Sequence, residues 1–413
     1  MFDCLYLNDS QEPGLRVGGE NDVFIGDVEV ILDDLEALIG DDVFHAAGIF
    51  IGGVLVDAHL HEHVGQDDLT LVETCGDFPA GLGQGRTAII GLGVIGKVHA
   101  NLIAKRGDEM VAFCDIEESR AVAAKEKWAP NAEVYTDYKE MLEKAKPEVV
   151  HICTPHYLHA EMVIEALGRD IHVLCEKPLC IRHEEIDRIL AAEKASSALL
   201  GVCHQNRYLA SNRFAKDYLK DKKILAAHGS VVWHRDAAYY ASDAWRGKWA
   251  TDGGGSLINQ ALHTLDLTMW FSGDPESVIS TASNLTMKNE IEVEDTIFAR
   301  FEGNVPFTFL GTNTSMADMP VEVSLHLSDH TVMTVLPSTM LINGVPVPSA
   351  TARKPSYGKE CYGSGHEALI ADFYGCIREG RSFPIDGHEG ARVIRLILAA
   401  YESASTNKQV KIK

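Results

Sequence analysis

The sequence predicts an α/β region with a parallel sheet, followed by an α+β region whose open sheet is mainly antiparallel and carries helices on one face. Three observations predict this organisation. Apolar strand-like runs alternate with helical patterns over residues 86–206, short β-rich runs follow over residues 207–413, and the charge pattern changes at residue 85. The 413 residues are enough to build two sizeable cores.

Residues 1–85 differ in composition from the rest of the chain. They contain 18 acidic residues and a single basic one, Arg16, whereas residues 86–413 contain 42 acidic and 36 basic residues. We therefore expect an acidic N-terminal extension. It is either a folded segment, an unstructured leader, or a stretch that a misplaced start codon has added.

The overall composition excludes several classes of partner. A formal net charge of −23 argues against nucleic acid and against an anionic membrane surface, because both require concentrated Lys and Arg. The longest apolar run, residues 46–56, is far shorter than the roughly 18 residues that a membrane helix needs. The first residues are acidic and polar, unlike a secretory signal, so a cytoplasmic protein is expected.

No metal site is predicted from the cysteines and histidines. The nine cysteines lie mostly inside apolar runs without metal-type spacing, which predicts buried thiols. His59, His61 and His63 alternate as metal ligands on a strand would. No cysteine or carboxylate pattern completes a site there, so we favour an alternating polar strand or an unstructured leader.

A glycine-rich turn predicts dinucleotide binding. Gly91, Gly93 and Gly96 follow a short apolar run in G-x-G-x-x-G spacing, and a helical pattern begins with Val94 and Ile95. The first glycine permits a tight turn, the second lets the backbone approach a pyrophosphate, and the third lets helix and strand pack closely. The free N–H groups of the helix N-terminus then face the phosphates.

The residue that ends the next apolar run predicts NAD rather than NADP. Asp115 lies 19 residues after Gly96, where an acid accepts a hydrogen bond from a ribose 2′-hydroxyl. Its charge would repel a 2′-phosphate, and Ile116 offers no cation to bind one. The pattern therefore predicts a Rossmann domain that prefers NAD.

Two further strands continue the parallel sheet. Ligands of such sheets bind beyond the carboxyl ends of the strands. The residues that follow these strands are therefore expected at the cofactor edge: Thr154, Pro155, His156, His159, Glu176 and Lys177. Lys177 stands between a buried strand and Pro178, which favours a lysine held at the cleft over a plain surface lysine.

Residues 207–413 predict the second region. Short β-rich runs with partial alternation are separated by turn residues, as is typical of antiparallel strands. Helices are expected at about 256–271, 365–379 and 387–404, and the last two are expected to pack against the sheet or the first region. Self-association is the simplest cover for the opposite sheet face.

The helix expected at 256–271 carries a polar stripe beside its apolar one. Asn259 and His263 stand one helical turn apart, so both can touch one small ligand, and Asp266 continues the stripe. Oxidation of a carbinol needs a base for the hydroxyl proton, and histidine has a suitable pKa. Lys177 can hold the same oxygen as a cation. The alternative is an Asn and a His that only bond backbone in the core.

The chain resembles the glucose-fructose oxidoreductase and inositol dehydrogenase family (Gfo/Idh/MocA) from about residue 86 to its C-terminus. The resemblance is carried by GLGVIGKVHA, TPHYLHAE, CEKPL, DGGGSLINQALHTLDL and GHEALIADFYGCIREGRSFPIDGHEGARVIRLILAAYES. It implies a Rossmann domain over 86–206 and a substrate-binding and oligomerisation domain over 207–413. It also implies NAD(P)-linked oxidation or reduction of a sugar, polyol or related compound by a homo-oligomer, a dimer or tetramer.

The chain departs from this family at one position. The family motif commonly carries an Asp where this chain has Asn259, and an amide can orient substrate but cannot carry charge or shuttle a proton. Lys177 and His263 then remain as the proton-handling pair. The variant Asn259→Asp restores the family's acid, so near-normal or raised activity with an altered pH profile is expected.

Substrate contacts are expected from a loop and from the connection between the domains. Trp245 and Trp249 can stack on sugar C–H faces or pack in the core, and Arg246 can bond hydroxyls or an anionic group. Arg207 reaches cofactor or substrate, or forms an interdomain salt bridge. We expect an NAD-dependent sugar or polyol dehydrogenase; the alternatives are a carbonyl reductase and a non-catalytic dinucleotide-sensing regulator.

Overall fold

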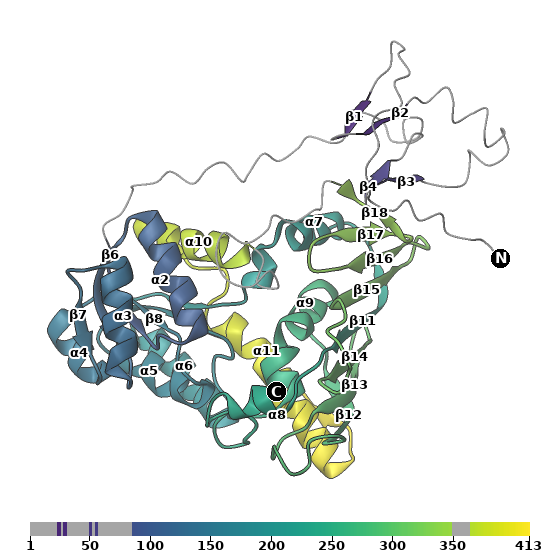
Figure 1. The fold of residues 1–413 in the computed structure, drawn as a ribbon. Coiled ribbons are helices and arrows are strands. Elements are labelled where there is room, and N and C mark those ends of the chain that lie inside the picture. The colour runs from purple at the N-terminus through teal and green to yellow at the C-terminus, as the bar shows by residue number, and fades with distance from the viewer. Residues whose placement is uncertain (1–22, 26–27, 31–48, 52–53, 57–84, 349–363) are drawn as a thin grey trace. The chain divides into compact units, whose positions relative to one another are not determined.

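The computed structural model of the chain (Figure 1) divides into two units, residues 1–76 and 77–413. It describes residues 23–25, 28–30, 49–51, 54–56, 85–348 and 364–413. The first unit holds two antiparallel pairs: β1 (Val23–Ile25) with β2 (Val28–Val30), and β3 (Ile49–Ile51) with β4 (Val54–Val56). The histidines at 59, 61 and 63 lie outside the described residues.

Six parallel strands form the first sheet of the second unit, in the order β10-β9-β8-β5-β6-β7. Sequence order reverses between β5 and β8, which is where sheets of this kind bind their ligands. The strands are β5 (Arg86–Ile90), β6 (Glu109–Cys114), β7 (Glu133–Tyr135), β8 (Val149–Ile152), β9 (His172–Cys175) and β10 (Leu200–Val202). The expected parallel Rossmann sheet is confirmed.

Helices pack against this sheet because its strands are apolar on both faces. One buried cluster joins Ile89 of β5 and Phe113 of β6 to the helices that follow these strands. The neighbouring Ala88 and Ile90 point the other way, into the main core. The helices are α2 (Val94–Arg106), α3 (Glu118–Trp128), α4 (Tyr138–Ala145), α5 (His159–Leu167) and α6 (His183–Ala195).

A nine-stranded sheet forms the other half of this unit, in the order β18-β17-β16-β15-β11-β14-β13-β12-β19. Its pairs are antiparallel except for β11 with β14. The expected mainly antiparallel sheet is therefore confirmed. The strands are β11 (Ile224–Val232), β12 (Ser277–Ser283), β13 (Thr296–Glu302), β14 (Phe307–Thr312), β15 (Glu322–Leu327), β16 (Val332–Val335), β17 (Met340–Ile342), β18 (Val345–Pro346) and β19 (Val410–Lys411).

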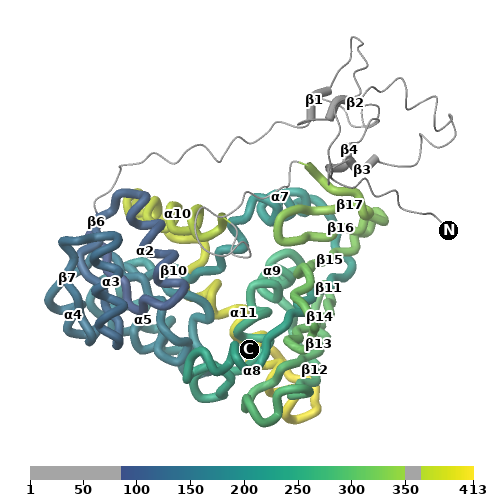
Figure 2. Tube along the Cα trace, in the orientation of Figure 1, coloured from purple at the N-terminus to yellow at the C-terminus, as the bar shows by residue number. Residues whose placement is uncertain are grey.

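Helix α11 (Gly387–Thr406) contacts strands of both sheets, β12 and β10 (Figure 2). Helix α9 (Leu262–Ser272) packs on β11 and β15, and α11 also packs on α6. Helix α10 (Gly365–Glu379) packs on α2 and on η2 (Gln205–Tyr208). The shorter helices are η1 (His156–Leu158), α7 (Ala210–Tyr218) and α8 (Ala237–Ala241). Within the described ranges, no helix is both long and apolar enough to cross a membrane.

The prediction of a single helix at 256–271 is wrong in one respect. The chain first makes a π-turn, η3 (Ser256–Gln260), and only then enters α9. The carboxylate of Glu294 accepts hydrogen bonds from Gly255 N at 2.8 Å and Leu257 N at 2.9 Å, which holds the wider turn in place. A Cβ on Gly255 would overlap Glu294 O, so this close approach requires glycine.

Candidate active site

The glycine-rich turn has the geometry that a dinucleotide requires. Gly91 has φ +86°, and a Cβ there would lie 2.6 Å from Cys153 O. A Cβ on Gly96 would overlap Gly91 O, whereas one on Gly93 would meet no atom within 4 Å. Helix α2 begins beside this open space with Val94, which is 65% exposed, and no side chain caps its first turn. Backbone N–H groups at an open surface fit a pyrophosphate.

Asp115 is held against this turn. Its Oδ2 accepts from Leu92 N at 2.7 Å and its Oδ1 accepts from Glu117 N at 2.9 Å. Each carboxylate oxygen can accept a further bond, so a ribose hydroxyl has a partner there. The next residue, Ile116, is 88% exposed and offers no positive charge. These features fit NAD.

The residues that follow β8 divide into two groups. Thr154 and Pro155 lead from the strand into η1 at the cofactor edge. His156 is buried and turns toward the second sheet region, with its Nδ1 2.9 Å from Asp252 O. His159 is fully buried, and its ring nitrogens lie 2.7 Å from Pro178 O and 2.8 Å from Thr154 O. The ring of His159 thus joins two loops, and its expected contact with cofactor stays a prediction.

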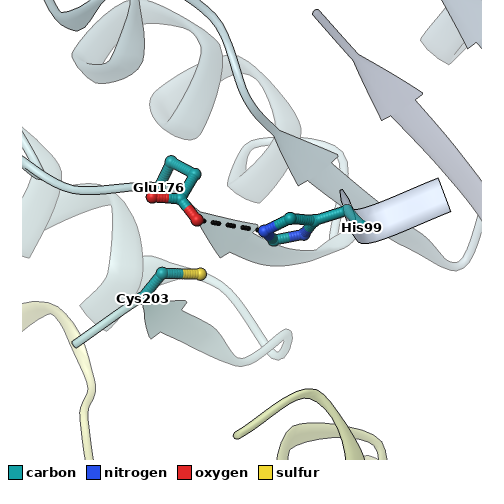
Figure 3. Close-up of side chains that lie close together, drawn as sticks. All are labelled: His99, Glu176 and Cys203. Atoms are coloured by element: carbon teal, nitrogen blue, oxygen red, sulfur yellow. Dashed lines mark hydrogen bonds and ion pairs between the residues drawn. The ribbon is translucent and has the colours of Figure 1, made fainter. Parts of the chain in front are cut away.

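Glu176 lies in a buried hydrogen-bonded cluster (Figure 3). Its Oε1 lies 3.0 Å from His99 Nε2 and 3.1 Å from His366 Nε2. Burial opposes ionisation of this carboxyl, but hydrogen bonds from His366 and His99 outweigh burial and hold its pKa well below the usual value. The carboxylate of Glu176 is thus used by these histidines, and its expected contact with cofactor stays a prediction.

The same cluster is the group of metal-type ligands that the described residues bring together. Ligand atoms of His99, Glu176 and Cys203 lie within 4.8 Å of one another. A metal would need the thiolate, and burial together with the charge of Glu176 raises the pKa of the Cys203 thiol well above its usual value. A protonated thiol beside a hydrogen-bonded histidine and carboxylate fits a structural network better than a metal centre.

Lys177 contacts the π-turn. Its Nζ donates to Asn259 O at 2.9 Å, which engages one of its three N–H donors. Burial lowers the pKa of Lys177, and the nearby charges of Glu176 and Asp252 offset part of this effect. The amine is thus fixed in position by the backbone of the residue that was expected beside it.

His263 lies close enough to Lys177 for the lysine charge to lower the imidazole pKa. Burial, the Lys177 charge and the His204 charge hold the pKa of His263 well below 6.5, so the imidazole is neutral at neutral pH. Its Nε2 lies 3.1 Å from Gln205 Nε2, and its Nδ1 has no hydrogen-bond partner among the described residues. An unpartnered buried nitrogen is a group that a bound hydroxyl would satisfy.

The Gln205 side chain determines which imidazole nitrogen carries the proton. Gln205 Oε1 is buried and has no hydrogen-bond partner among the described residues. Turning the amide by half a rotation exchanges Oε1 with Nε2, so that Oε1 accepts from His263 Nε2–H. Gln205 Oε1 and His263 Nε2–H are then paired, and the lone pair of His263 is left on Nδ1.

The side chain of Asn259 bonds an acid that the sequence analysis missed. Asn259 Nδ2 donates to Asp252 Oδ1 at 2.9 Å, and Asn259 Oδ1 accepts from Gln260 Nε2 at 3.1 Å. Asp252 is fully buried. Its place directly before three glycines was visible in the sequence, but nothing local showed that its carboxylate turns inward.

Asp266 and Arg207 are both buried and bond each other. Asp266 accepts from Arg207 Nε at 2.8 Å and from Nη2 at 2.6 Å, and Arg207 Nη1 donates to Glu389 Oε2 at 2.7 Å. Arg207 thus forms salt bridges, but with partners inside residues 207–413 and not between the two expected domains. Asp266, which was expected to continue the polar stripe of Asn259 and His263, is used instead in ion pairs that join η2 to α9 and α11 in the interior.

Aromatic and cationic side chains of the loop before the three glycines pack against one another. Arg246 donates to Tyr239 Oη at 2.7 Å and lies 4.6 Å from the centre of the Trp245 ring. Trp245 also contacts His156, with 4.7 Å between ring centres. Trp249 instead packs its edge against Tyr401. Trp245 therefore contacts His156, whose Nδ1 lies 3.1 Å from the Asp252 carboxylate, and Arg246 lies beside Trp245.

Comparisons with known protein families match both halves of the second unit. Residues 85–204 match the Gfo/Idh/MocA model described as an oxidoreductase family with an NAD-binding Rossmann fold. Residues 223–332 match the model of the Gfo/Idh/MocA C-terminal domain.

Individual relatives are similar over different lengths. D-glucoside 3-dehydrogenase of Escherichia coli K12 is 32% identical over 202 residues, which are 46% of this chain and 54% of the relative. Inositol 2-dehydrogenase of Salmonella typhimurium is 34% identical over 190 residues, 45% of this chain and 54% of the relative. The chain thus spans about half the length of these curated relatives. The WlbA dehydrogenase of Bordetella pertussis, solved with NADH and UDP-GlcNAcA, is 26% identical with a TM-score of 0.70, covering 80% of this chain and 99% of that one.

Proposed function

The chain belongs to the Gfo/Idh/MocA oxidoreductase family, and on this basis we propose that it is an NAD-dependent enzyme that transfers hydride between nicotinamide and a sugar, polyol or related compound. One observation carries the proposal: the Lys177 amine, which follows β9, is fixed by Asn259 O, and its charge acts on a neutral His263 whose Nδ1 has no partner among the described residues. The relatives that are named as glucoside and inositol dehydrogenases support the substrate class.

The bound nicotinamide would supply the hydride chemistry, and the chain's own residues would handle the proton. In the oxidative direction His263, neutral at neutral pH, takes the hydroxyl proton of the substrate. Lys177 stabilises the negative charge that develops on the same oxygen. Asn259 orients the substrate through its amide.

The test is a turnover assay with NAD and a panel of sugars, polyols, glycosides and sugar acids. We expect NADH to form with at least one of them, or to be consumed with the matching ketone. Tight NAD binding without turnover on the whole panel, in both directions, would favour the dinucleotide-sensing alternative.

The position of Asp115 predicts the cofactor preference. We expect NAD to bind at least about tenfold more tightly than NADP, because the carboxylate repels a 2′-phosphate. Asp115→Asn should reduce the difference in affinity between NAD and NADP and still offer an oxygen that accepts from Leu92 N. Asp115→Ala should also reduce this difference, but it loses the hydrogen bond that supports the glycine-rich turn. Calorimetric titration with both cofactors measures the difference. Equal or tighter binding of NADP by the unaltered protein would contradict the assignment.

The two shifted pKa values predict the pH profile of kcat/KM for oxidation. Activity needs neutral His263, and the pKa of this group is lowered, so the acid limb should lie well below pH 6.5. It also needs protonated Lys177, whose pKa is lowered too, so activity should fall as pH rises and before pH 10.5. Initial rates across this range measure both limbs. An acid limb above pH 6.5 would argue against His263 as the base.

The exposed face of the nine-stranded sheet supports a homo-oligomer as part of the proposal. The hydroxyl of Ser280 in β12 donates to Ala400 O of α11, so the side chains of its neighbours in the strand point away from the helices. Ile279 on that outer face is 40% exposed, and Phe298 of β13 is 51% exposed. A second copy of the chain would cover these apolar side chains.

A further inference from the structure

Asp252 carries a feature that the proposed mechanism does not use. Its carboxylate is fully buried, and burying a carboxylate is costly unless hydrogen bonds or opposite charges compensate. Oδ2 accepts from Gly247 N at 2.9 Å, and Oδ1 accepts from Asn259 Nδ2 at 2.9 Å and lies 3.1 Å from His156 Nδ1. These contacts hold the acid at the junction of the loop, the π-turn and the cofactor edge.

The contacts continue from Asp252 to the reacting amine. A carboxylate only accepts hydrogen bonds, so it fixes the orientation of the Asn259 amide, with Nδ2 inward and Oδ1 on the other side. The main-chain oxygen of Asn259 accepts from Lys177 Nζ. One residue thus links the acid to the amine, through its side chain on one side and its backbone on the other.

Charge links them as well. The charged groups that act on Lys177 are Glu176 beside it, Asp252 on the loop and Arg246 on the same loop, and Lys177 in turn acts on His263 of α9. Glu176 already faces two histidines. Asp252 is therefore the acid on the π-turn side that favours the charged form of the amine.

We infer that Asp252 is a positioning residue for the proposed reaction: it fixes the Asn259 amide and, through the Asn259 backbone, the place of the Lys177 amine. The inference rests on the proposed function for its kinetic part. It also changes the expectation for Asn259→Asp, because the new carboxylate would face Asp252 across a hydrogen-bond distance. Two such groups cannot both ionise freely, so this variant should lose activity rather than keep it.

Exchanging the acid and the amide between positions 252 and 259 tests the hydrogen bond that joins them. In Asp252→Asn the new amide must direct its NH₂ group toward a donor, either Asn259 Nδ2 or Gly247 N, so one contact is lost in either orientation. In the double variant Asp252→Asn with Asn259→Asp, the amide donates to the new acid and its oxygen still accepts from Gly247 N. The hydrogen bond is then complete again, with its direction reversed, and the pair again holds one negative charge.

We expect each single variant to lower kcat by about tenfold with little change in NAD affinity, and the double variant to return to within about threefold of the unaltered protein. Asp252→Asn should also move the alkaline limb of kcat/KM to lower pH by about one pH unit. Asp295→Asn is the matched control. Asp295 is equally buried and accepts from Leu285 N and Thr286 N, but it is not among the charges that act on Lys177.

A second measurement does not depend on turnover. The rate at which an amine-reactive reagent labels Lys177, followed by mass spectrometry across pH, reports its charge. The midpoint should fall in Asp252→Asn, return in the double variant and stay unchanged in Asp295→Asn. An unchanged midpoint in Asp252→Asn, or a double variant no better than the worse single one, would overturn the inference. Absence of turnover in the unaltered protein with the expected labelling shifts would overturn the proposed function alone.

Discussion

Replacing Lys177 by alanine is expected to lower kcat/KM for the best substrate of the panel by about 10³-fold or more. The variant loses a substrate anchor and the charge that stabilises the developing alkoxide, so kcat and kcat/KM should fall together. NAD affinity should change little, because the cradle of the pyrophosphate and Asp115 lie on other loops. Initial rates and calorimetry with NAD measure the two effects separately.

Two controls separate chemistry from folding. Lys177→Ala loses one hydrogen bond, to Asn259 O, which is worth about 0.5–1.5 kcal/mol of stability and should shift Tm by only a few degrees. Lys177→Arg keeps a charge without the compact ammonium group and should recover only a small part of the rate. Turnover of Lys177→Ala within tenfold of the unaltered protein would show that the amine is not part of the reaction.

The parts of this fold that were predictable are those that short stretches of sequence determine. The spacing of Gly91, Gly93 and Gly96 requires a particular turn, and each glycine has the surroundings that its expected role demands. The two C-terminal helices lie within two residues of their expected ends, because their apolar periodicity is strong. The alternation of strand-like runs with helical patterns predicted the parallel sheet, and the short β-rich runs with partial alternation predicted the antiparallel one.

The site was predictable only in outline, because contacts between distant residues decide it. The four-residue spacing of Asn259 and His263 placed both near Lys177, but Glu294 bends the chain into a π-turn that local pattern does not show. Polar residues after a strand also bond other parts of the chain. His159 and Glu176 turn inward because their partners, such as Pro178 and His366, come from other segments.

Asp252 and Gln205 were not predicted from the sequence, because contacts between distant residues decide their roles as well. Neither belongs to a pattern with a known spacing, yet each bonds a residue that the sequence analysis selected. Both side chains are buried, and a buried polar atom without a partner is costly. The residue that a buried polar atom bonds therefore indicates its role. A buried amide and a buried acid next to predicted catalytic groups are visible only once the chain is folded.

Replacing His263 by alanine is expected to lower kcat by about 10²–10⁴-fold, the usual range for the loss of a positioned general base. The NAD affinity should stay within about twofold, since the imidazole contacts Gln205 and not the glycine turn. The acid limb of kcat/KM should disappear, because no group with its pKa remains to take the hydroxyl proton. Steady-state rates across pH measure both effects on a confirmed substrate.

The second variant at this position tests the role of the nitrogen itself. His263→Gln keeps a polar group that can bond Gln205 but cannot accept the proton, so it should be nearly as slow as His263→Ala. Added imidazole, which fits the space left by the deleted ring, should restore part of the rate in His263→Ala and none in Lys177→Ala. If His263→Ala kept full turnover while Lys177→Ala abolished it, Lys177 would itself be the base. Its lowered pKa would then set the acid limb, because a lysine base must first lose its proton.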